Sequence, residues 1–541
     1  MNNSSRNTPK KKAILSGNEA IARGAYEAGA RAGTGYPGTP STEILQALKE
    51  YPGIYTEWSV NEKVALEVAI GASLAGARTL VTMKHVGLNV AADPLFTLPY
   101  IGVKGGLVIA CADDPGMHSS QNEQDNRNYA YAAKLPCLEP SDSQEAKDFT
   151  ALAFALSERY NTPVLLRTTT RVSHSQGQVT LGKRLSLPRK KGFERHPASY
   201  VMIPAYARPR HVEVERRLVR VAKDAETLSI NRAEYGSREV GFITSGACYT
   251  YIKEVFPEAS VLKLGMVYPL PEKLIRAFCG RVKRAVVVEE LDPFIEMRIK
   301  ALGIAVEGKK YFPLTGELDP DTIREAFLGK KRKALPKSMP LPPRPPALCP
   351  GCPHRTVFQT LKKLGAVVSG DIGCYTLGVL PPFNAMDTCV DMGASITIAQ
   401  GIEIGEGAAY RHNTVAVIGD STFAHSGITG LINAAYNKRT SLIVVLDNGT
   451  TAMTGMQPNP LSGQTITGEQ TVALDYGKLA EAVGIAKEQF KIIDAYAPND
   501  MESTLAGFLA SGKLSLVVVR GLCIILKKKL AKKEKGGGRH A

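Results

Sequence analysis

The sequence predicts an α/β protein with mostly parallel sheets, arranged as three doubly wound domains. Short runs rich in β-branched residues recur along the 541 residues, and stretches with a helical pattern separate them. These runs are apolar throughout rather than alternating, which is typical of strands buried on both faces. Two breaks in composition divide the chain, whose length exceeds what one hydrophobic core usually supports.

The predicted elements follow one another at regular intervals. Strands are predicted over residues 79–83, 106–110, 163–167, 240–244, 284–288, 414–418, 441–446 and 514–519. Ala-rich amphipathic helices are predicted over residues 18–30 and 63–74.

The composition breaks set the expected domain boundaries. Residues 176–238 are rich in charge and proline, and residues 329–347 form a Pro-rich stretch typical of a stiff, extended linker. We therefore expect domains over 1–190, 236–335 and 336–525, a connecting segment over 191–235, and a basic disordered tail over 526–541.

The net charge of +16 is concentrated at the two ends of the chain. No basic stripe studded with aromatic residues accompanies it, which favours solvated tails over binding to nucleic acid or a membrane. The first twelve residues lack a secretory signal, and Arg520 interrupts the apolar stretch 514–526, so no transmembrane helix is expected. Nine cysteines without an export signal favour reduced thiols and a cytoplasmic location.

The strongest chemical signal lies in the third domain. Gly419-Asp420-Ser421 ends the strand predicted over 414–418, and Asn448 follows the next predicted strand. Open α/β sheets place ligands at the carboxyl ends of parallel strands. Carboxylate and amide oxygens suit Mg²⁺, phosphate oxygens can complete its octahedron, and the helix after Asp420 would point its amino-terminal end at a phosphate.

This spacing resembles the thiamine diphosphate motif, in which Gly-Asp-(Gly/Ser) is followed by Asn. By that resemblance Asp420 and Asn448 would ligate Mg²⁺ together with the backbone carbonyl of Thr450, and Gly419 and Ser421 would contact the coenzyme. A turn Asp and an unrelated loop Asn are the alternative.

Met392-Gly393 precedes an Ala- and Gly-rich helix predicted over 396–407. A Met-Gly at this place resembles the segment that packs beneath the thiamine and bends it. Core packing is the alternative for Met392, because methionine commonly fills gaps.

A thiamine enzyme also needs a carboxyl group facing N1′ of the aminopyrimidine, so that the 4′-nitrogen can take the C2 proton. Asn61-Glu62 followed by an Ala-rich helix resembles the pyrimidine-binding segment of these enzymes, which assigns that role to Glu62. Glu67 is the competitor. A surface Glu in the first turn of a helix is the alternative for Glu62.

Several stretches together resemble the α-subunit of indolepyruvate ferredoxin oxidoreductase, in the same order from about residue 13 to about 520. They are Gly-Tyr-Pro-Gly-Thr-Pro-Ser-Thr-Glu (35–43), the stretch 57–67 around Asn61-Glu62, Ala-Asp-Asp-Pro-Gly-Met-His-Ser-Ser-Gln-Asn-Glu-Gln-Asp (112–125), Cys-Pro-Gly-Cys-Pro-His-Arg (349–355), Gly-Asp-Ile-Gly-Cys-Tyr-Thr-Leu-Gly (370–378) and Thr-Ala-Met-Thr-Gly-Met-Gln (451–457). The resemblance implies a thiamine-diphosphate-binding fold with a pyrimidine-binding domain, a transketolase-carboxyl-terminal-like domain and a diphosphate-binding domain. It also implies a separate smaller β-subunit, and hence a hetero-oligomer.

The resemblance assigns further roles at the substrate. Thr39 would contact the carboxylate end of the 2-oxoacid. His118 would orient a carboxylate or shuttle a proton, with a structural hydrogen bond as an equal alternative. Lys84 and His85 lie at another strand exit.

Related oxidoreductases hold a [4Fe-4S] cluster with Cys-Pro-Gly-Cys, a Gly-Cys and a distant fourth cysteine, and four thiolates are normally needed. Cys349, Cys352 and Cys374 match the first three. No cysteine stands in 483–487, where the fourth is expected, and Cys389 could substitute for it. A tight loop with buried thiols is the alternative.

The resembled subunit usually continues into a ferredoxin-like domain with two cysteine runs, whereas the only late thiol here is Cys523. Ferredoxin or a separate ferredoxin-like subunit would then receive the electrons. The expected reaction is oxidative decarboxylation of an aryl pyruvate such as indolepyruvate, with transfer of the acyl group to coenzyme A. A non-oxidative thiamine diphosphate lyase or decarboxylase, and a non-catalytic scaffold subunit, are the alternatives.

Overall fold

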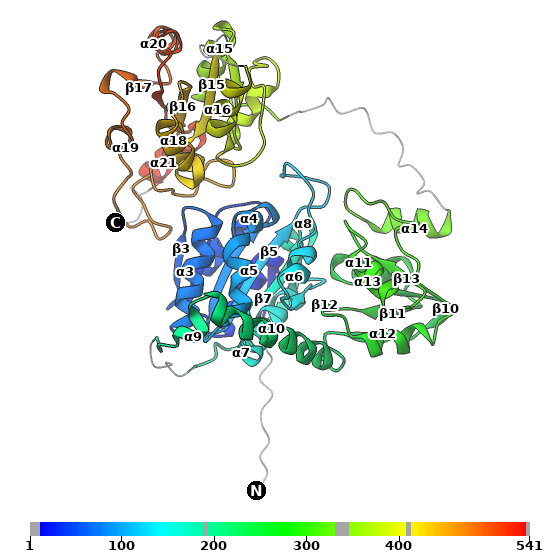
Figure 1. Cartoon of the computed structure of the whole chain (residues 1–541). Helices are drawn as coiled ribbons and strands as arrows, with labels where there is room; N and C mark the ends of the chain where they lie inside the picture. Colours follow the sequence, from blue (N-terminus) through cyan, green and yellow to red (C-terminus); the bar gives the residue numbers. More distant parts are fainter. Residues whose placement is uncertain (1–10, 188–192, 330–345, 407–412, 537–541) are drawn as a thin grey trace. The chain divides into compact units, whose positions relative to one another are not determined.

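The computed structural model describes residues 11–187, 193–329, 346–406 and 413–536 (Figure 1). The chain divides into two compact units, Met1–Lys337 and Ser338–Ala541, each considered by itself below. The Pro-rich linker expected over 329–347 lies almost entirely outside the described residues. The α/β class and the predominance of parallel strands are confirmed in both units.

A seven-stranded sheet forms the framework of the first unit, and all its strands except the short edge strand β12 run parallel. In spatial order the strands are β12 (Met266–Tyr268), β6 (Cys137–Leu138), β7 (Val164–Thr169), β5 (Leu107–Asp113), β4 (Thr79–Lys84), β2 (Ala32–Gly35) and β3 (Tyr55–Trp58). The chain runs from β2 to β3 on one side and then returns to β4 on the other. The carboxyl ends of β2 and β4 therefore flank a topological switch point, where open α/β sheets bind ligands.

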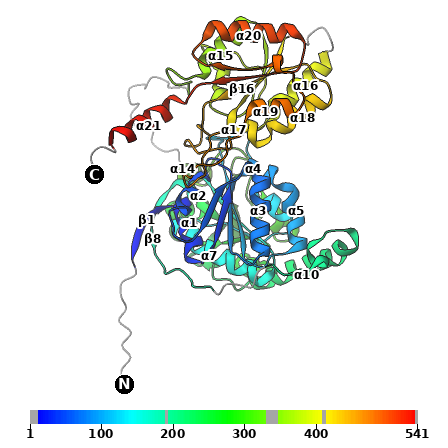
Figure 2. The same cartoon turned by 90° about the vertical axis from the view of Figure 1, so that its left-hand side faces the viewer.

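Helices cover both faces of this sheet, as Figure 2 shows. One face carries α7 (Ser143–Tyr160) with α1 (Gly17–Glu27) packed on it, and the other carries α3 (Glu62–Leu74) and α5 (Ala92–Ile101). Short helices stand at the strand exits: α2 (Thr42–Leu48), α4 (His85–Val90), α6 (Arg127–Ala132) and α8 (Thr170–His174). A separate antiparallel pair joins β1 (Lys12–Ser16) to β8 (Gln176–Thr180).

A four-stranded sheet completes the first unit, in the order β13 (Arg284–Val288), β10 (Ser237–Thr244), β11 (Ala259–Lys263) and β9 (Arg232–Glu234). Its helices are α11 (Gly246–Val255), α12 (Glu272–Cys279), α13 (Phe294–Ala301) and α14 (Pro320–Leu328). On one face, Ile243, Leu262 and Val287 enter the same apolar cluster as Val81 and Ile109 of the large sheet. The two sheets thus share one hydrophobic core.

The segment 191–235, expected as a surface connection, contains α9 (Pro197–Tyr200) and the 22-residue helix α10 (Pro204–Ala225). Val214, Arg217 and Val221 are buried at helical spacing. Arg217 donates a hydrogen bond of 2.8 Å to the carbonyl of Pro99 in α5, so this charged helix is docked on the first unit.

The second unit is built on five parallel strands in the order β14 (Val367–Ser369), β15 (Thr414–Gly419), β16 (Leu442–Asp447), β18 (Ser515–Arg520) and β17 (Phe490–Asp494). Along β15, Val415 and Val417 pack with α15 (His354–Lys363) and α20 (Pro498–Ser511). The alternate residues Ala416 and Ile418 pack with α16 (Ala394–Glu406), α18 (Ile428–Tyr436) and α19 (Tyr476–Ala482) on the other face. Short helical segments of this unit are η1 (Cys374–Val379), α17 (Asp420–Thr422), η3 (Phe423–Gly427) and η4 (Lys487–Gln489). Both faces of the sheet are therefore buried, as the apolar runs predict.

The basic tail expected to be disordered over 526–541 begins instead within a helix, α21 (Ile524–Gly536). Lysine is a good helix former, which explains why its density does not prevent a helix. Within the described ranges, no helix has the length and apolar character needed to cross a bilayer. All nine cysteines are free of disulfide bonds in the structure.

Candidate active site

Asp420 lies directly after β15 and is buried at the carboxyl edge of the second sheet. Its Oδ1 accepts a hydrogen bond of 2.8 Å from the backbone amide of Ser421, and its Oδ2 accepts one of 3.3 Å from the Nδ2 of Asn459. Burial raises the pKa of Asp420 to about 7, and the nearby carboxylate of Asp447 adds to this effect. A divalent cation at this place would favour the ionised form again.

The loop after β16 brings Asn448 and Thr450 to the same edge. The Oδ1 of Asn448 accepts a hydrogen bond of 3.1 Å from the amide of Thr450, and the hydroxyl of Thr451 donates one of 2.8 Å to Ser421 Oγ. Together with the contact between Asn459 and Asp420, these bonds join the Asn448 loop to the Gly419–Ser421 turn. The predicted metal and phosphate ligands of the second unit are thus brought together, and Asn459 is an additional member that the motif did not indicate.

The helical run over 420–436 begins at Asp420 and contains a π turn, η3, between α17 and α18. Such turns occur frequently at functional sites. Ser426 in this turn donates a hydrogen bond of 2.8 Å to the carbonyl of Met392, which places the Met392-Gly393 segment beside it. On its other side, the amide of Gly393 donates one of 2.8 Å to the buried Asp371.

Replacing Gly393 by Ala is expected to lower the free energy of unfolding by roughly 2–4 kcal/mol, from backbone strain and overpacking together. Gly393 has a φ of +91°, and a Cβ there would lie 2.0 Å from Ser426 Oγ. Chemical denaturation measures the effect. The control is Gly401→Ala in α16, where a Cβ meets nothing within 4 Å and a helical Ala is favoured. Equal stability of the two variants would contradict the expectation.

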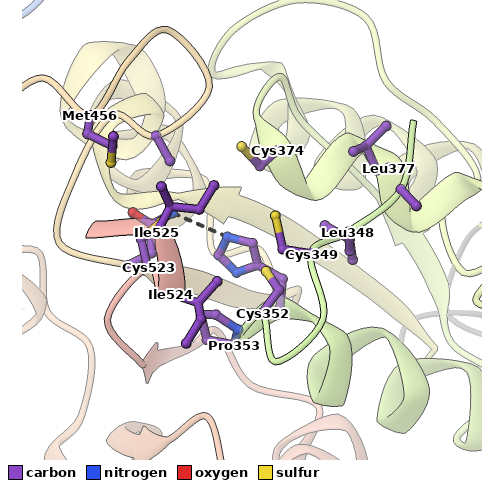
Figure 3. Close-up of a pocket in the computed structure, with 14 residues that line it drawn as sticks. Leu348, Cys349, Cys352, Pro353, Cys374, Leu377, Met456, Cys523, Ile524 and Ile525 are labelled. Carbon is purple, nitrogen blue, oxygen red and sulfur yellow. Dashed lines mark hydrogen bonds between the residues drawn. The ribbon is translucent and has the colours of Figure 1, made fainter. Parts of the chain in front are cut away.

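Four thiols line one pocket in the second unit, with a volume of about 110 Å³. They are Cys349, Cys352, Cys374 and Cys523, and Figure 3 shows them around the pocket. Cys349 and Cys352 precede α15, Cys374 begins η1, and Cys523 follows β18. Burial raises the pKa of Cys352 and of Cys374 to about 11, so thiolate ligation here needs bound positive charge to offset burial.

The fourth thiol that lines this pocket is Cys523, whereas Cys389, the substitute ligand that the sequence offered, does not line it. The Sγ of Cys389 lies 3.5 Å from the carbonyl of Asp371, and Cys389 does not line the pocket. Cys523 stands at the carboxyl end of a parallel strand, as Asp420 and Asn448 do, and that position was the signal that could have identified it.

His354 connects the thiol pocket to the Asn448 loop. Burial lowers the pKa of His354 to about 4, so the imidazole is neutral, and its Nε2 accepts a hydrogen bond of 3.3 Å from the Nδ2 of Asn448. Both side chains line the pocket. One candidate metal ligand, Asn448, thus lines the same pocket as the four thiols.

In the part of the chain that the structure describes, no three His, Cys, Asp or Glu side chains converge closely enough to hold a single metal ion. Two chemistries fit this finding. Each thiolate of a [4Fe-4S] cluster binds a different iron, so the thiols surround a space instead of meeting at one point. Mg²⁺ in phosphate-binding enzymes uses one or two protein carboxylates and takes its other ligands from phosphate and water.

In the first unit, Glu62 is buried at the start of α3, where Asn61 caps the helix by accepting a 2.9 Å hydrogen bond from Val64. A Cβ on Gly87 would lie 2.5 Å from Glu62 Oε1, so α4 approaches the carboxyl group closely. Glu67, the competing candidate, is exposed and pairs with Lys63 on the helix surface. Because Glu62 is buried and Glu67 is exposed, Glu62 is the stronger candidate for a contact with the coenzyme.

Thr39 and the 118–120 loop lie together at the carboxyl edge of the large sheet. The hydroxyl of Ser119 donates a hydrogen bond of 3.3 Å to the carbonyl of Thr39. His118 is exposed, and its Nε2 lies 3.4 Å from Glu317 Oε2, a carboxylate that also binds Arg171. This surface contact with Glu317 is compatible with the structural alternative for His118, and its role at the substrate stays a prediction.

Two family models match the chain. The model for "Pyruvate flavodoxin/ferredoxin oxidoreductase, thiamine diP-bdg" matches residues 23–238, and the model for "Thiamine pyrophosphate enzyme, C-terminal TPP binding domain" matches residues 371–519. They cover the regions that contain Glu62 and Asp420. Fold and site define the class, a thiamine diphosphate-binding enzyme of the 2-oxoacid oxidoreductases.

Curated relatives narrow this class. The indolepyruvate oxidoreductase subunit IorA of Archaeoglobus fulgidus is 41% identical over 99% of this chain and 90% of its own length. The subunit of the same name from Methanothermobacter thermautotrophicus is 43% identical over 88% of this chain and 81% of its own length. The chain belongs to the indolepyruvate oxidoreductase subunit IorA family.

A solved 2-oxoglutarate:ferredoxin oxidoreductase from Magnetococcus marinus has the same fold over part of its length. Its TM-score is 0.51 at 17% identity, over 58% of this chain and 64% of that one. This likeness supports the α/β architecture described above.

Proposed function

We propose that this chain is the coenzyme-binding subunit of an oxidoreductase that acts on aryl pyruvates. The reaction consumes an aryl pyruvate and coenzyme A and forms an aryl acyl-coenzyme A, carbon dioxide and a proton. Two electrons leave through the four-thiol pocket to ferredoxin or a ferredoxin-like subunit. A smaller β-subunit completes the hetero-oligomer.

One pocket of the second unit carries this proposal. Asn448 and His354 line it together with four thiols, Cys349, Cys352, Cys374 and Cys523. An oxidative decarboxylation needs an electron acceptor beside its coenzyme, whereas a lyase needs none. The four thiols supply the ligand number for a [4Fe-4S] cluster. They therefore favour the oxidative reaction over a non-oxidative lyase.

When bound, thiamine diphosphate would supply the electron sink for decarboxylation. Asp420, Asn448 and the carbonyl of Thr450 would hold Mg²⁺, with Gly419 and Ser421 beside the diphosphate. Met392 and Gly393 would support the thiazolium ring, and Glu62 would hold a proton at N1′ of the aminopyrimidine. Thr39 would contact the substrate carboxylate.

The proposal is tested on anaerobically purified chain with its partner subunit. Iron and sulfide should be present, thiamine diphosphate with Mg²⁺ should raise the melting temperature, and an aryl pyruvate should reduce ferredoxin only when coenzyme A is added. Release of an aldehyde without iron would establish the lyase instead. Absence of any response to the coenzyme would establish a scaffold subunit.

The apparent affinity for Mg²⁺ in the presence of coenzyme should fall about tenfold for each pH unit below about 7 and stay level above it. Burial raises the pKa of Asp420 to about 7, so below that pH a proton must leave before the metal binds. Coenzyme-dependent melting shifts, titrated with Mg²⁺ at several pH values, measure this slope.

Asp420→Asn removes the titrating group, so it should weaken Mg²⁺ binding and abolish the slope. The matched control is Asp500→Asn, which alters an exposed carboxylate of the same unit that pairs with Lys491. A slope that persists in Asp420→Asn would assign the proton to another group.

A further inference from the structure

Lys84 is a buried ammonium group at the carboxyl end of β4, beside the switch point of the large sheet. Its aliphatic stem runs under the loop that contains Thr39, because a Cβ on Gly38 would lie 3.0 Å from Lys84 Cγ. Its Nζ donates a hydrogen bond of 3.0 Å to the carbonyl of Ser119. Ser119 in turn donates to the carbonyl of Thr39, so the three residues share one site.

Asp114, whose carboxylate acts electrostatically on Lys84, does not form an ion pair with it in the described residues. Asp114 is held by the side chains of Ser120 and Thr170, each at 2.7 Å, and by the amide of Ser119 at 2.8 Å. An ammonium group has three protons to donate, and the hydrogen bond to Ser119 uses one of them. A buried cation with remaining donors is suited to an anionic ligand.

We propose that Lys84 binds the carboxylate of the 2-oxoacid substrate and thereby selects acids over neutral ketones. This inference rests on the proposed function and adds a specificity-determining residue to it. The ion pair is strongest in the bound substrate and weakens as the carboxylate leaves as carbon dioxide. Lys84 therefore contributes to substrate binding more than to the chemical step.

The ammonium is expected to titrate within an accessible pH range. Burial lowers the pKa of Lys84 to about 8, and the carboxylates of Asp114 and Glu62 offset part of this effect. His85 also faces this region, and burial lowers its pKa to about 4, so it stays neutral. Acid binding should therefore weaken as the pH rises through about 8.

The experiment compares calorimetric binding of an aryl pyruvate and its methyl ester to coenzyme-loaded full chain, with its partner, in wild type, Lys84→Met and Lys84→Arg. Lys84→Met should weaken binding of the acid on the order of 100-fold and that of the ester less than about threefold. The KM should rise and kcat should not fall. Lys84→Arg should restore most of the affinity and remove its dependence on pH near 8. Lys49→Met, at an exposed lysine of the same unit, is the control.

In Lys84→Met, equal losses of affinity for the acid and for the ester would overturn the inference. Unchanged affinity for the acid would overturn it as well. Failure of the proposed function has a different signature, because the wild-type chain would then show no melting shift with thiamine diphosphate and Mg²⁺. If Lys84→Met does not fold, the acid-to-ester affinity ratio of wild type and its pH dependence still decide the question. An acid-to-ester affinity ratio near one at pH 7 would contradict the role of Lys84 in binding the carboxylate.

Discussion

Replacing Glu62 by Gln should lower turnover by roughly 10²–10⁴-fold while thiamine diphosphate binding remains largely intact. The amide occupies the same buried space at the start of α3, close to Gly87, but it cannot hold and release a proton. Steady-state rates of aryl pyruvate oxidation and a coenzyme-dependent melting shift measure the two effects separately.

Glu67→Gln is the matched control for that experiment. It makes the same chemical change five positions along the same helix, at an exposed residue paired with Lys63. Its turnover should match wild type. Full activity in Glu62→Gln, or an equal loss in Glu67→Gln, would refute the assignment of Glu62.

Replacing Cys523 by Ser should remove bound iron and abolish ferredoxin reduction. Four thiolates are normally needed to hold a [4Fe-4S] cluster, and Cys523 lines the same pocket as Cys349, Cys352 and Cys374. Iron and sulfide content, the visible absorption of the chromophore and ferredoxin-linked rates measure the loss. Coenzyme binding should persist, because Asp420 and the side chain of Asn448 are unchanged.

Cys389→Ser is the control for this prediction, because it removes a thiol that is not expected to bind iron. Cys389 is half-buried in the same unit, and the sequence offered it as a substitute for the missing fourth ligand. The structure places it beside the carbonyl of Asp371 instead. Iron content should therefore stay at the wild-type level, and iron loss in Cys389→Ser with retention in Cys523→Ser would reverse the assignment.

Much of the fold could be predicted because its main strands are short, continuously apolar runs. Each of the eight predicted strands overlaps an observed one, and the run predicted over 284–288 coincides with β13 (Arg284–Val288). The edge strand β12 could not be predicted, because three residues carry no periodic signal and the strand depends on pairing with β6. The helix α10 was missed because its charge and its internal Pro209 outweighed the sparse buried stripe of Val214, Arg217, Val221 and Ala225.

The candidate site could be predicted wherever a residue follows a strand in a known motif. Asp420 and Asn448 are such residues, and hydrogen bonds link their loops in the structure. Asn459 could not be found in this way, because its contact with Asp420 arises only when distant loops meet at the edge of one sheet. Cys523 follows the strand β18, but it belongs to no known motif, so only its place after a strand pointed to it. The exposure of His118 and its contact with Glu317 could not be read from the sequence either, and its role at the substrate stays a prediction.

The apolar cluster that joins Val81 and Ile109 to Ile243, Leu262 and Val287 has a practical consequence. The large and the four-stranded sheet should unfold as one cooperative block, because separating them would leave a continuous apolar surface in water on each piece. Anyone who wishes to express part of this chain should therefore cut beyond α14. A cut between the two sheets is expected to give fragments that aggregate.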